Sequence, residues 1–346
     1  MESILAYRIK NARKLKCLTQ QEVADEIGVS KQMISKYEKG LSTPNSSKII
    51  ELAKLFEQKI DYFFRSYKVE LSEVNFRKKT KFSIKKEDSL KELIKIKLEN
   101  YLWVEEILSI DYSFKNVIKN HKIQSPIDIE KVVLILRKYW DIGIDPIHNI
   151  IQLLEDKEIK VIELDNVDEN FEGLACFVNK KYPIIVINKK FTVERKRFTL
   201  LHELGHLLLN ISNSEIEKYC NKFASELLLP KDVLIQEFGG KRKQISLLEL
   251  IAIQKKYGIS IQAIVYRLVD ANILSKERSK LFHQKINFDP NLKKEINQSR
   301  FKTPEFSSRY ERLIYRALSE ENISLSKASA LLDINIETVR ENFATI

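Results

Sequence analysis

Residues 199–209 read TLLHELGHLLL, a segment with few options for local structure. Five of its six leucines lie at positions 200, 201, 204, 207 and 208, and this spacing predicts a helix with one buried side. His202 and His206 are four residues apart, so both imidazoles project from one face of that helix and can occupy two corners of a tetrahedral Zn²⁺ site. Glu203 is then close enough to reach a water molecule at the metal without ligating the metal itself.

The alternative is that the two histidines are hydrogen-bonded core groups on a leucine-rich helix. Chance spacing of this kind is rare, because the chain has only five histidines and the expectation for H-E-x-x-H is below ~0.05 per sequence. A third ligand candidate is also at hand, since residues 217–230 (EKYCNKFASELLLP) read as another helix, which contains Glu217 and ends at Pro230. Asn221 shares a flank with Glu217, where its amide can hydrogen-bond a ligating histidine and fix the orientation of the ring.

Three other side chains compete with Glu217 for the third ligand position: Cys220, Glu215 and Glu226. Cys220 is the strongest of them, because thiolates bind zinc well. It falls, however, on the apolar stripe of its helix, where a small cysteine is ordinary packing.

A pair of short helices is predicted near the N-terminus, where residues 18–40 read LTQQEVADEIGVSKQMISKYEKG. Gly28 allows a tight turn between the two helices, and Ser30 is placed to cap the second. The inward side chains are Val23, Ala24, Ile27, Met33, Ile34 and Tyr37. Such a pair is either a packing unit or a helix-turn-helix, whose second helix fits the major groove of DNA.

The side chains left outward on the second helix suit DNA recognition. These are Lys31, Gln32, Ser35 and Lys36. Glutamine can bind adenine with two hydrogen bonds, and lysine can reach guanine or phosphate. Gln20, at the start of the first helix, is placed to hold a backbone phosphate. The segment from Thr19 to Gly40 resembles the Cro/C1 (Xre) helix-turn-helix family, which implies binding to a double-stranded DNA operator, commonly as a homodimer on a two-fold site.

The segment with the two histidines and the segment with Glu217 together resemble the ImmA/IrrE family of zinc metallopeptidases. The resemblance rests on RFTLLHELGHLLL and ExxCNKFASELLLP, and extends upstream through KVIEL and PIIVIN and downstream through SLLELIAIQKKYGISIQAIVYRL. It implies one zinc ion held by His202, His206 and Glu217, with Glu203 as the general base. Cys220 departs from the family pattern, which has alanine at this position. Candidates for the group that stabilises the oxyanion are Tyr182, Tyr257, Tyr266 and Arg267.

Composition excludes several classes of protein. Few glycines and prolines (8 and 7 in 346 residues) argue against a β-sandwich or collagen and favour helix. No apolar run is long enough to span a membrane, and the charged N-terminus does not read as a signal peptide. Three widely spaced cysteines encode no disulfide framework, so we expect a cytoplasmic protein. The net charge of +11 favours polyanionic partners but is spread over many lysines.

We therefore expect a mainly α (α+β) chain in four parts. Residues 1–66 form an all-α helix-turn-helix domain. Residues 67–125 form a basic linker and a connecting helix: the segment 67–97 is partly extended, has no strong apolar period until Leu90, and leads into a helix that runs to about Ile110. Residues 126–270 form an α+β zincin-like metallopeptidase domain whose small sheet contains the strands Lys160–Leu164, Gly173–Val178 and Pro183–Ile187. Residues 271–346 form a helical C-terminal region, in which Ala317–Phe343 reads as another short helix pair.

The leading hypothesis is a DNA-binding protein with a zinc endopeptidase that cleaves a repressor or another regulatory protein. The resemblance implies that such peptidases relieve repression by cutting a helix-turn-helix repressor. One alternative is a transcriptional regulator whose metal domain is sensory or structural and does not cut peptides. Another is an antitoxin-like component of a toxin–antitoxin pair.

Overall fold

The computed structural model describes residues 3–66, 69–72, 83–165, 167–211 and 214–343. The chain forms two compact units. The first contains residues 1–71, 79–110 and 311–346, and the second contains residues 72–78 and 111–310. Each unit is described by itself.

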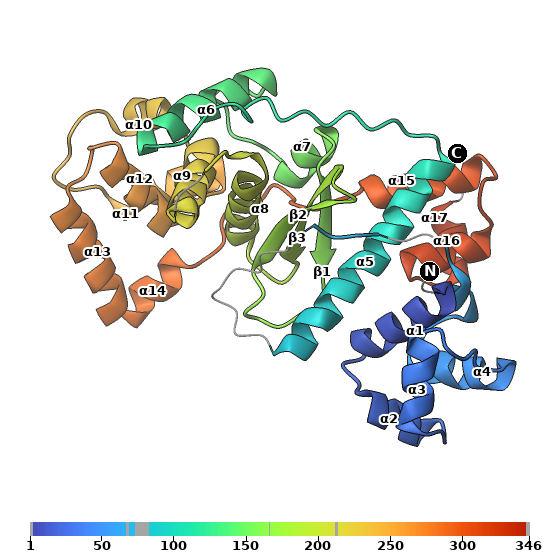
Figure 1. Cartoon of the computed structure of the whole chain (residues 1–346). Helices are drawn as coiled ribbons and strands as arrows, with labels where there is room; N and C mark the ends of the chain where they lie inside the picture. Colours follow the sequence, from blue (N-terminus) through green and yellow to red (C-terminus); the bar gives the residue numbers. More distant parts are fainter. Residues whose placement is uncertain (1–2, 67–68, 73–82, 166, 212–213, 344–346) are drawn as a thin grey trace. The chain divides into compact units, whose positions relative to one another are not determined.

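The named elements in the described part of the first unit are all helices (Figure 1). Its elements are α1 (Ile4–Leu15), α2 (Gln20–Glu26), α3 (Lys31–Glu38), α4 (Ser46–Leu55), the short 3₁₀ helix η1 (Ile60–Phe64), α5 (Ile84–Ile107), α15 (Arg309–Ser319), α16 (Leu325–Leu332) and α17 (Ile336–Asn342). Buried aliphatic and aromatic side chains from α1 to η1 form one core, with Ile9, Ile34, Leu52, Phe56 and Phe63 completely enclosed.

Helix α5 begins inside the segment that was expected to be a linker. Residues 67–97 were predicted to be partly extended, but the helix starts at Ile84. Ser83 caps it by accepting a hydrogen bond from the backbone of Lys86, and Lys91 pairs with Glu87 one turn earlier at 2.7 Å. Lysine and glutamate are good helix formers, so a charged segment without an apolar period can still be helical. Residues 67–68 and 73–82 of the expected linker lie outside the described residues.

The C-terminal helix pair has the predicted form. Ser324 caps α16, Asp333 takes the left-handed conformation that ends it, and Asn335 caps α17. The compact units divide the chain differently from the expected parts. Residues 79–110 group with the N-terminus because α5 packs on α1, where Arg8 and Glu99 form a buried ion pair of 2.6 Å.

The second unit has a three-stranded sheet covered by helices (Figure 1). Its strands are β1 (Lys160–Leu164), β2 (Gly173–Val178) and β3 (Tyr182–Asn188), in the order β1-β3-β2. Strand β3 is parallel to β1 and antiparallel to β2. Asn179 and Lys180 both have positive φ and join β2 to β3 in a tight hairpin turn. Strand β2 therefore lies at an edge of the sheet.

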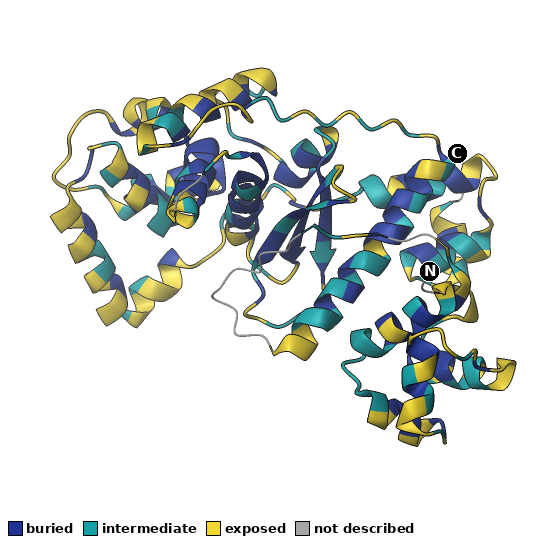
Figure 2. Cartoon of the chain, in the orientation of Figure 1, coloured by how far each residue is buried: buried dark blue, intermediate teal, exposed yellow. Residues whose placement is uncertain are grey.

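The helices of this unit are α6 (Pro126–Tyr139), α7 (Ile150–Asp156), α8 (Val193–Leu208), α9 (Ile216–Leu228), α10 (Lys231–Phe238), α11 (Leu247–Tyr257), α12 (Ile261–Asp270), α13 (Lys276–Phe288) and α14 (Pro290–Ile296). Helix α8 lies against the sheet and α9 packs on α8 (Figure 1). Figure 2 shows that most residues of α8 and α9 are buried, whereas most residues of α13 are exposed or only partly buried. The mainly α architecture with a small sheet is as predicted. No helix in the described part of the chain is both long and apolar enough to cross a bilayer.

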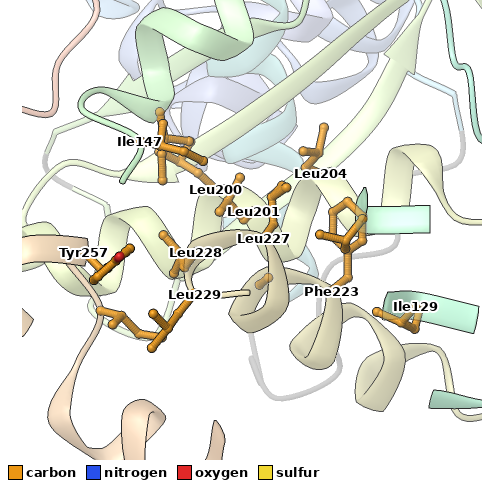
Figure 3. Close-up of a cluster of buried hydrophobic side chains, with 14 of the residues drawn as sticks. Ile129, Ile147, Leu200, Leu201, Leu204, Phe223, Leu227, Leu228, Leu229 and Tyr257 are labelled. Atoms are coloured by element: carbon orange, nitrogen blue, oxygen red, sulfur yellow. The ribbon is translucent and has the colours of Figure 1, made fainter. Parts of the chain in front are cut away.

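Helices α8 and α9 contribute many of the buried side chains in the core of the second unit. Leu200, Leu201 and Leu204 of α8 meet Phe223 and Leu227 of α9, and all five side chains are completely buried (Figure 3). Burial of such side chains stabilises a fold by about 1.5–3 kcal/mol each. The leucines that predicted the helix from sequence are therefore the residues that hold it in place.

Candidate functional site

Helix α8 presents two imidazoles on the face opposite its leucines. His202 is completely buried, whereas the side chain of His206 is 22% exposed. The Nε2 atoms of the two rings lie 3.1 Å apart. Two ring nitrogens this close without a shared ligand are unfavourable neighbours when both carry lone pairs, so the arrangement suits a common cation.

Helix α9 brings a carboxylate to the same place. The oxygens of Glu217 lie 3.4 Å from Nε2 of His202 and 3.3 Å from Nε2 of His206. The Glu217 side chain is 55% exposed, so this side of the cluster faces solvent. In a tetrahedral site with metal–ligand distances of about 2.0–2.1 Å, neighbouring ligand atoms are about 3.3 Å apart. The residues present thus fit a zinc ion in both donor type and spacing.

A glycine allows α9 to approach α8 closely enough for this arrangement. Gly205 lies between the two histidines, and a Cβ atom at this position would lie only 3.0 Å from Sγ and 3.3 Å from Cα of Cys220. Any larger residue would therefore push the two helices apart. The sequence places Gly205 inside H-E-x-x-H but does not reveal its contact with α9.

Asn221 contacts His202 from the side away from the cluster. Its Oδ1 lies 2.8 Å from Nδ1 of His202. An amide oxygen can only accept, so this contact favours the tautomer with a proton on Nδ1 and leaves the lone pair of Nε2 toward Glu217. This is the arrangement in which a neutral histidine serves as a metal ligand.

Cys220 is the one competing ligand that the structure keeps beside the histidines. Its sulfur and the ligand atoms of His202 and His206 all lie within 4.8 Å of one another. The side chain is completely buried between α8 and α9. The other two rivals have different partners: Glu215 pairs with Lys218 at 2.9 Å, and Glu226 is buried with Arg267 at 2.7 Å. Burial raises the pKa of Glu226, and the Arg267 charge opposes that rise.

Glu203 is buried beneath the edge strand. It is 3% exposed, and Gly173 at the start of β2 lies directly against it. A Cβ atom at position 173 would lie 3.3 Å from Cγ of Glu203 and 3.0 Å from the Thr199 methyl group. A glycine here therefore lets β2 pass close to the general-base candidate, a role that strand pattern alone did not reveal.

The four candidates for oxyanion stabilisation lie in different surroundings. Tyr182 packs edge-on against Tyr112 at a ring distance of 4.7 Å, and Tyr257 is buried in the core. Tyr266 is exposed and stacks on His283, while Arg267 donates to the carbonyl of Leu229 and pairs with Glu226. Arg267 is thus engaged in fixing the end of α9.

The N-terminal helix pair has the geometry predicted from its turn and caps. Gly28 has a φ of 65°, and Oγ of Ser30 accepts a hydrogen bond from the backbone of Met33 at the start of α3. Lys31, Gln32 and Lys36 are exposed on α3, and Ser35 is partly exposed. The face that would enter a groove is therefore open.

Gln20 is partly buried and hydrogen-bonded to α3. Its Nε2 donates to Glu38 at 2.7 Å, and the same carboxylate, 4% exposed, accepts from Arg13 at 2.5 and 3.0 Å. This network joins α1, α2 and α3. The contact between Gln20 and a DNA phosphate remains a prediction. Nε2 of Gln20 already donates one hydrogen bond to Glu38, so the phosphate would have to accept from the second N–H of that amide.

Two family models match the chain. Residues 9–63 match the model described as Helix-turn-helix, and residues 154–269 match the Peptidase_M78 model described as IrrE N-terminal-like domain. The Cro/C1-type and ImmA/IrrE-like resemblances are thereby confirmed: the chain carries a DNA-binding helix-turn-helix domain and a domain of a metallopeptidase family.

Several proteins are similar to part of the chain. An uncharacterised transcriptional regulator in the ATPase CF(0) region of Rhodospirillum rubrum is 36% identical over 64 residues, which are 18% of this chain and 59% of that protein. Uncharacterised HTH-type transcriptional regulators of Rickettsia prowazekii and Rickettsia conorii are each 31% identical over 64 residues, again 18% of this chain, and 49% and 51% of those proteins. The chain thus spans about half the length of these relatives.

One solved structure aligns with the whole chain, namely Bacillus thuringiensis PlcR in complex with the peptide PapR7 and DNA. The alignment covers 99% of both chains with 14% identity and a TM-score of 0.18. A score this low supports no conclusion about fold or function.

Proposed function

We propose that this chain is a sequence-specific DNA-binding protein of the cytoplasm whose zinc-dependent endopeptidase cleaves a repressor or another regulatory protein. The observation that carries the proposal is the convergence of His202, His206 and Glu217, whose ligand atoms lie 3.1–3.4 Å apart. The three side chains would hold one zinc ion and leave one coordination position open toward solvent, which is typical of catalytic rather than structural zinc sites.

The chemistry then follows from the residues around the ion. When bound, zinc supplies Lewis acidity toward the scissile carbonyl and lowers the pKa of water. Glu203 takes a proton from the attacking water as its oxygen bonds to the carbonyl carbon. The same carboxyl group returns the proton to the leaving amine when the C–N bond breaks. Asn221 keeps the His202 ring in the tautomer that this role needs.

The edge strand offers a place for the peptide. Phe177 of β2 turns its backbone away from β3, because its carbonyl accepts from Ser72 and its N–H donates to the Ser72 hydroxyl. Backbone groups alternate along an antiparallel strand, so those of Gly173 and Ala175 face the same outer edge. In the described part of the chain no hydrogen bond satisfies them. A substrate strand added here would pass Glu203, which contacts Gly173.

The DNA-binding domain would place the peptidase near its substrate. Lys31, Gln32, Ser35 and Lys36 lie on the open face of α3 and are the proposed contacts to the operator. Tethering an enzyme to DNA raises its effective concentration for a substrate bound at a neighbouring site. A helix-turn-helix repressor is therefore a fitting substrate, and a homodimer would match a two-fold operator.

A cleavage assay tests the proposal. Purified full-length protein, with zinc or with a chelator, is incubated with proteins encoded by neighbouring genes, and products are identified by mass spectrometry. We expect zinc-dependent cleavage of one regulatory protein, and none by Glu203→Gln. Equal cleavage by Glu203→Gln would overturn the mechanism, since the substitution removes the base and keeps the shape.

One observation favours a second function, a regulator whose metal site is structural. The Cys220 sulfur lies beside both histidines. If its thiolate joined Glu217 as a fourth ligand, the site would be closed and no water could be activated. The spectrum of the cobalt-substituted protein separates the two: thiolate-to-cobalt charge transfer that Cys220→Ala abolishes supports the structural site, and its absence supports the catalytic one.

A further inference from the structure

A polar cavity lies beside the candidate metal centre in the second unit. Its volume is about 240 Å³, and its walls come from the start of α8, the α11–α12 junction and the end of α14. This is below the range of about 300–1,000 Å³ that is usual for whole small-molecule ligands. The cavity is of a size for one side chain of a larger molecule.

The cavity adjoins the histidines through Phe198. This residue lines the cavity, and its ring centroid lies 6.4 Å from that of His202, one turn further along α8. Arg195, also in the lining, is one turn earlier on the same face of the helix. The α8 wall of the cavity thus continues directly into the ligand-bearing face.

The cavity also adjoins the edge strand. Arg195 at its rim pairs with Glu172 at 3.1 Å, and Glu172 directly precedes Gly173, the residue that contacts Glu203. A peptide that follows β2 past Glu203 therefore reaches the cavity within a residue or two of the bond being cut.

The charged groups of the lining are already matched. Oε1 of the buried Glu194 accepts hydrogen bonds from Gln254 at 3.1 Å and from the backbone of Arg300 at 2.8 Å. Arg195 is paired with Glu172 and half exposed. Glu194 would repel an added anion and Arg195 would repel an added cation, so the cavity favours neither a negatively nor a positively charged side chain.

Two side-chain amides remain for recognition. Gln262 at the start of α12 and Asn297 just after α14 both line the cavity, and no described residue is hydrogen-bonded to either amide. Phe198 and Ile296 supply apolar walls. Amides that can both donate and accept, set between apolar surfaces, match a side chain that carries an amide of its own.

We infer that this cavity is a specificity subsite that receives a glutamine or asparagine side chain next to the scissile bond, an inference that rests on the proposed peptidase function. Gln262 and Asn297 are its specificity-determining residues. A single neutral hydrogen bond contributes a few-fold to about tenfold in affinity, so two amides give a clear but moderate preference.

The test uses full-length, zinc-loaded Glu203→Gln protein, which should bind peptides without cutting them. Binding to an immobilised library of synthetic peptides is compared with binding by the same protein carrying Gln262→Leu or Asn297→Leu. The cleavage preferences of the protein with Glu203 intact are measured on the same library. Gln236→Leu, on the exposed side of α10, is the matched control.

We expect glutamine or asparagine to be preferred at one peptide position, and this preference to fall about fivefold in the cavity variants and to persist in the control. A preference for a charged or apolar residue there, or one that the cavity variants leave unchanged, overturns the subsite. Absence of both binding and cleavage in zinc-loaded protein removes the peptidase function itself, and the subsite with it.

Discussion

Oδ1 of Asn221 lies 2.8 Å from Nδ1 of His202. Asn221 follows Glu217 by one helical turn on α9. In the proposed metal site, α9 would thus supply both a carboxylate ligand, Glu217, and the amide that orients His202 of α8. Partners of this kind fix the ring and raise its basicity, and their loss typically costs about 10–100-fold in metal affinity.

Replacing Asn221 by Ala should therefore weaken zinc binding by about 10–100-fold without removing a ligand. Competition with a chromophoric chelator measures the affinity. Asn291→Ala, on the exposed surface of α14, is the control and should bind zinc as the parent protein does. An unchanged affinity in Asn221→Ala would show that this contact does not prepare His202 for the metal.

A buried ion pair holds α8 to the rest of its unit. Arg197 of α8 and Glu305 lie 2.7 Å apart and both side chains are completely buried. Arg197 also donates to the carbonyls of Ile147 and Tyr257. Removing one member of such a pair leaves an uncompensated buried charge.

Glu305→Ala should lower the free energy of unfolding of this unit by about 3–5 kcal/mol. Asp165→Asn breaks the Lys189–Asp165 pair, whose side chains are 54% and 58% exposed, and should cost less than about 1 kcal/mol. Urea denaturation of both variants and of the parent protein measures these changes in the free energy of unfolding. Similar losses in the two variants would contradict the role assigned to the buried pair.

The cysteines should differ sharply in reactivity. Burial raises the pKa of the Cys176 thiol to about 12, and Cys17 is partly exposed. The thiolate is the reactive form, so almost none is present on Cys176 at pH 8, and raising the pH to 9 still leaves the pH far below that pKa. Iodoacetamide should label Cys17 in the folded protein and leave Cys176 unmodified at both pH values. Peptide mass spectrometry identifies the labelled cysteines. Labelling of Cys176 to the same extent as Cys17 would contradict the burial of Cys176.

The exposed face of α3 makes a separate prediction about DNA. Lys36→Ala should weaken binding to all sequences and reduce the salt dependence by about one unit of slope, whereas Gln32→Ala should relax the preference at one base pair, a loss of about 1–3 kcal/mol. Selection from randomised duplexes, followed by titration at several salt concentrations, measures both effects. Lys276→Ala, exposed on α13 of the second unit, is the control. If Gln32→Ala lowers affinity equally for every sequence, α3 does not read bases through this residue.

The elements with a strong local pattern were predictable from sequence. Strands β1 and β2 have the predicted bounds, and β3 extends one residue beyond them at each end, to Tyr182 and Asn188. The position of α8 followed from its leucines, although the helix begins before the leucine-rich segment, at Val193.

What sequence did not reveal depends on contacts between distant segments. Gly173 and Gly205 matter because β2 and α9 approach α8 closely, and a lone glycine in a strand or helix gives no sign of its neighbour. The partnership of Arg197 with Glu305 spans more than a hundred residues. The sequence did not reveal that Gln20 is hydrogen-bonded to Glu38, because this bond depends on how α2 and α3 pack.

The most direct test of the metal centre is a crystal structure of the zinc-loaded protein with anomalous data collected at the zinc absorption edge. We predict one zinc ion bonded to Nε2 of His202, Nε2 of His206 and the carboxylate of Glu217, with solvent in the remaining position. A zinc ion bonded to Sγ of Cys220 in that position, or zinc bound away from the two histidines, would contradict this prediction.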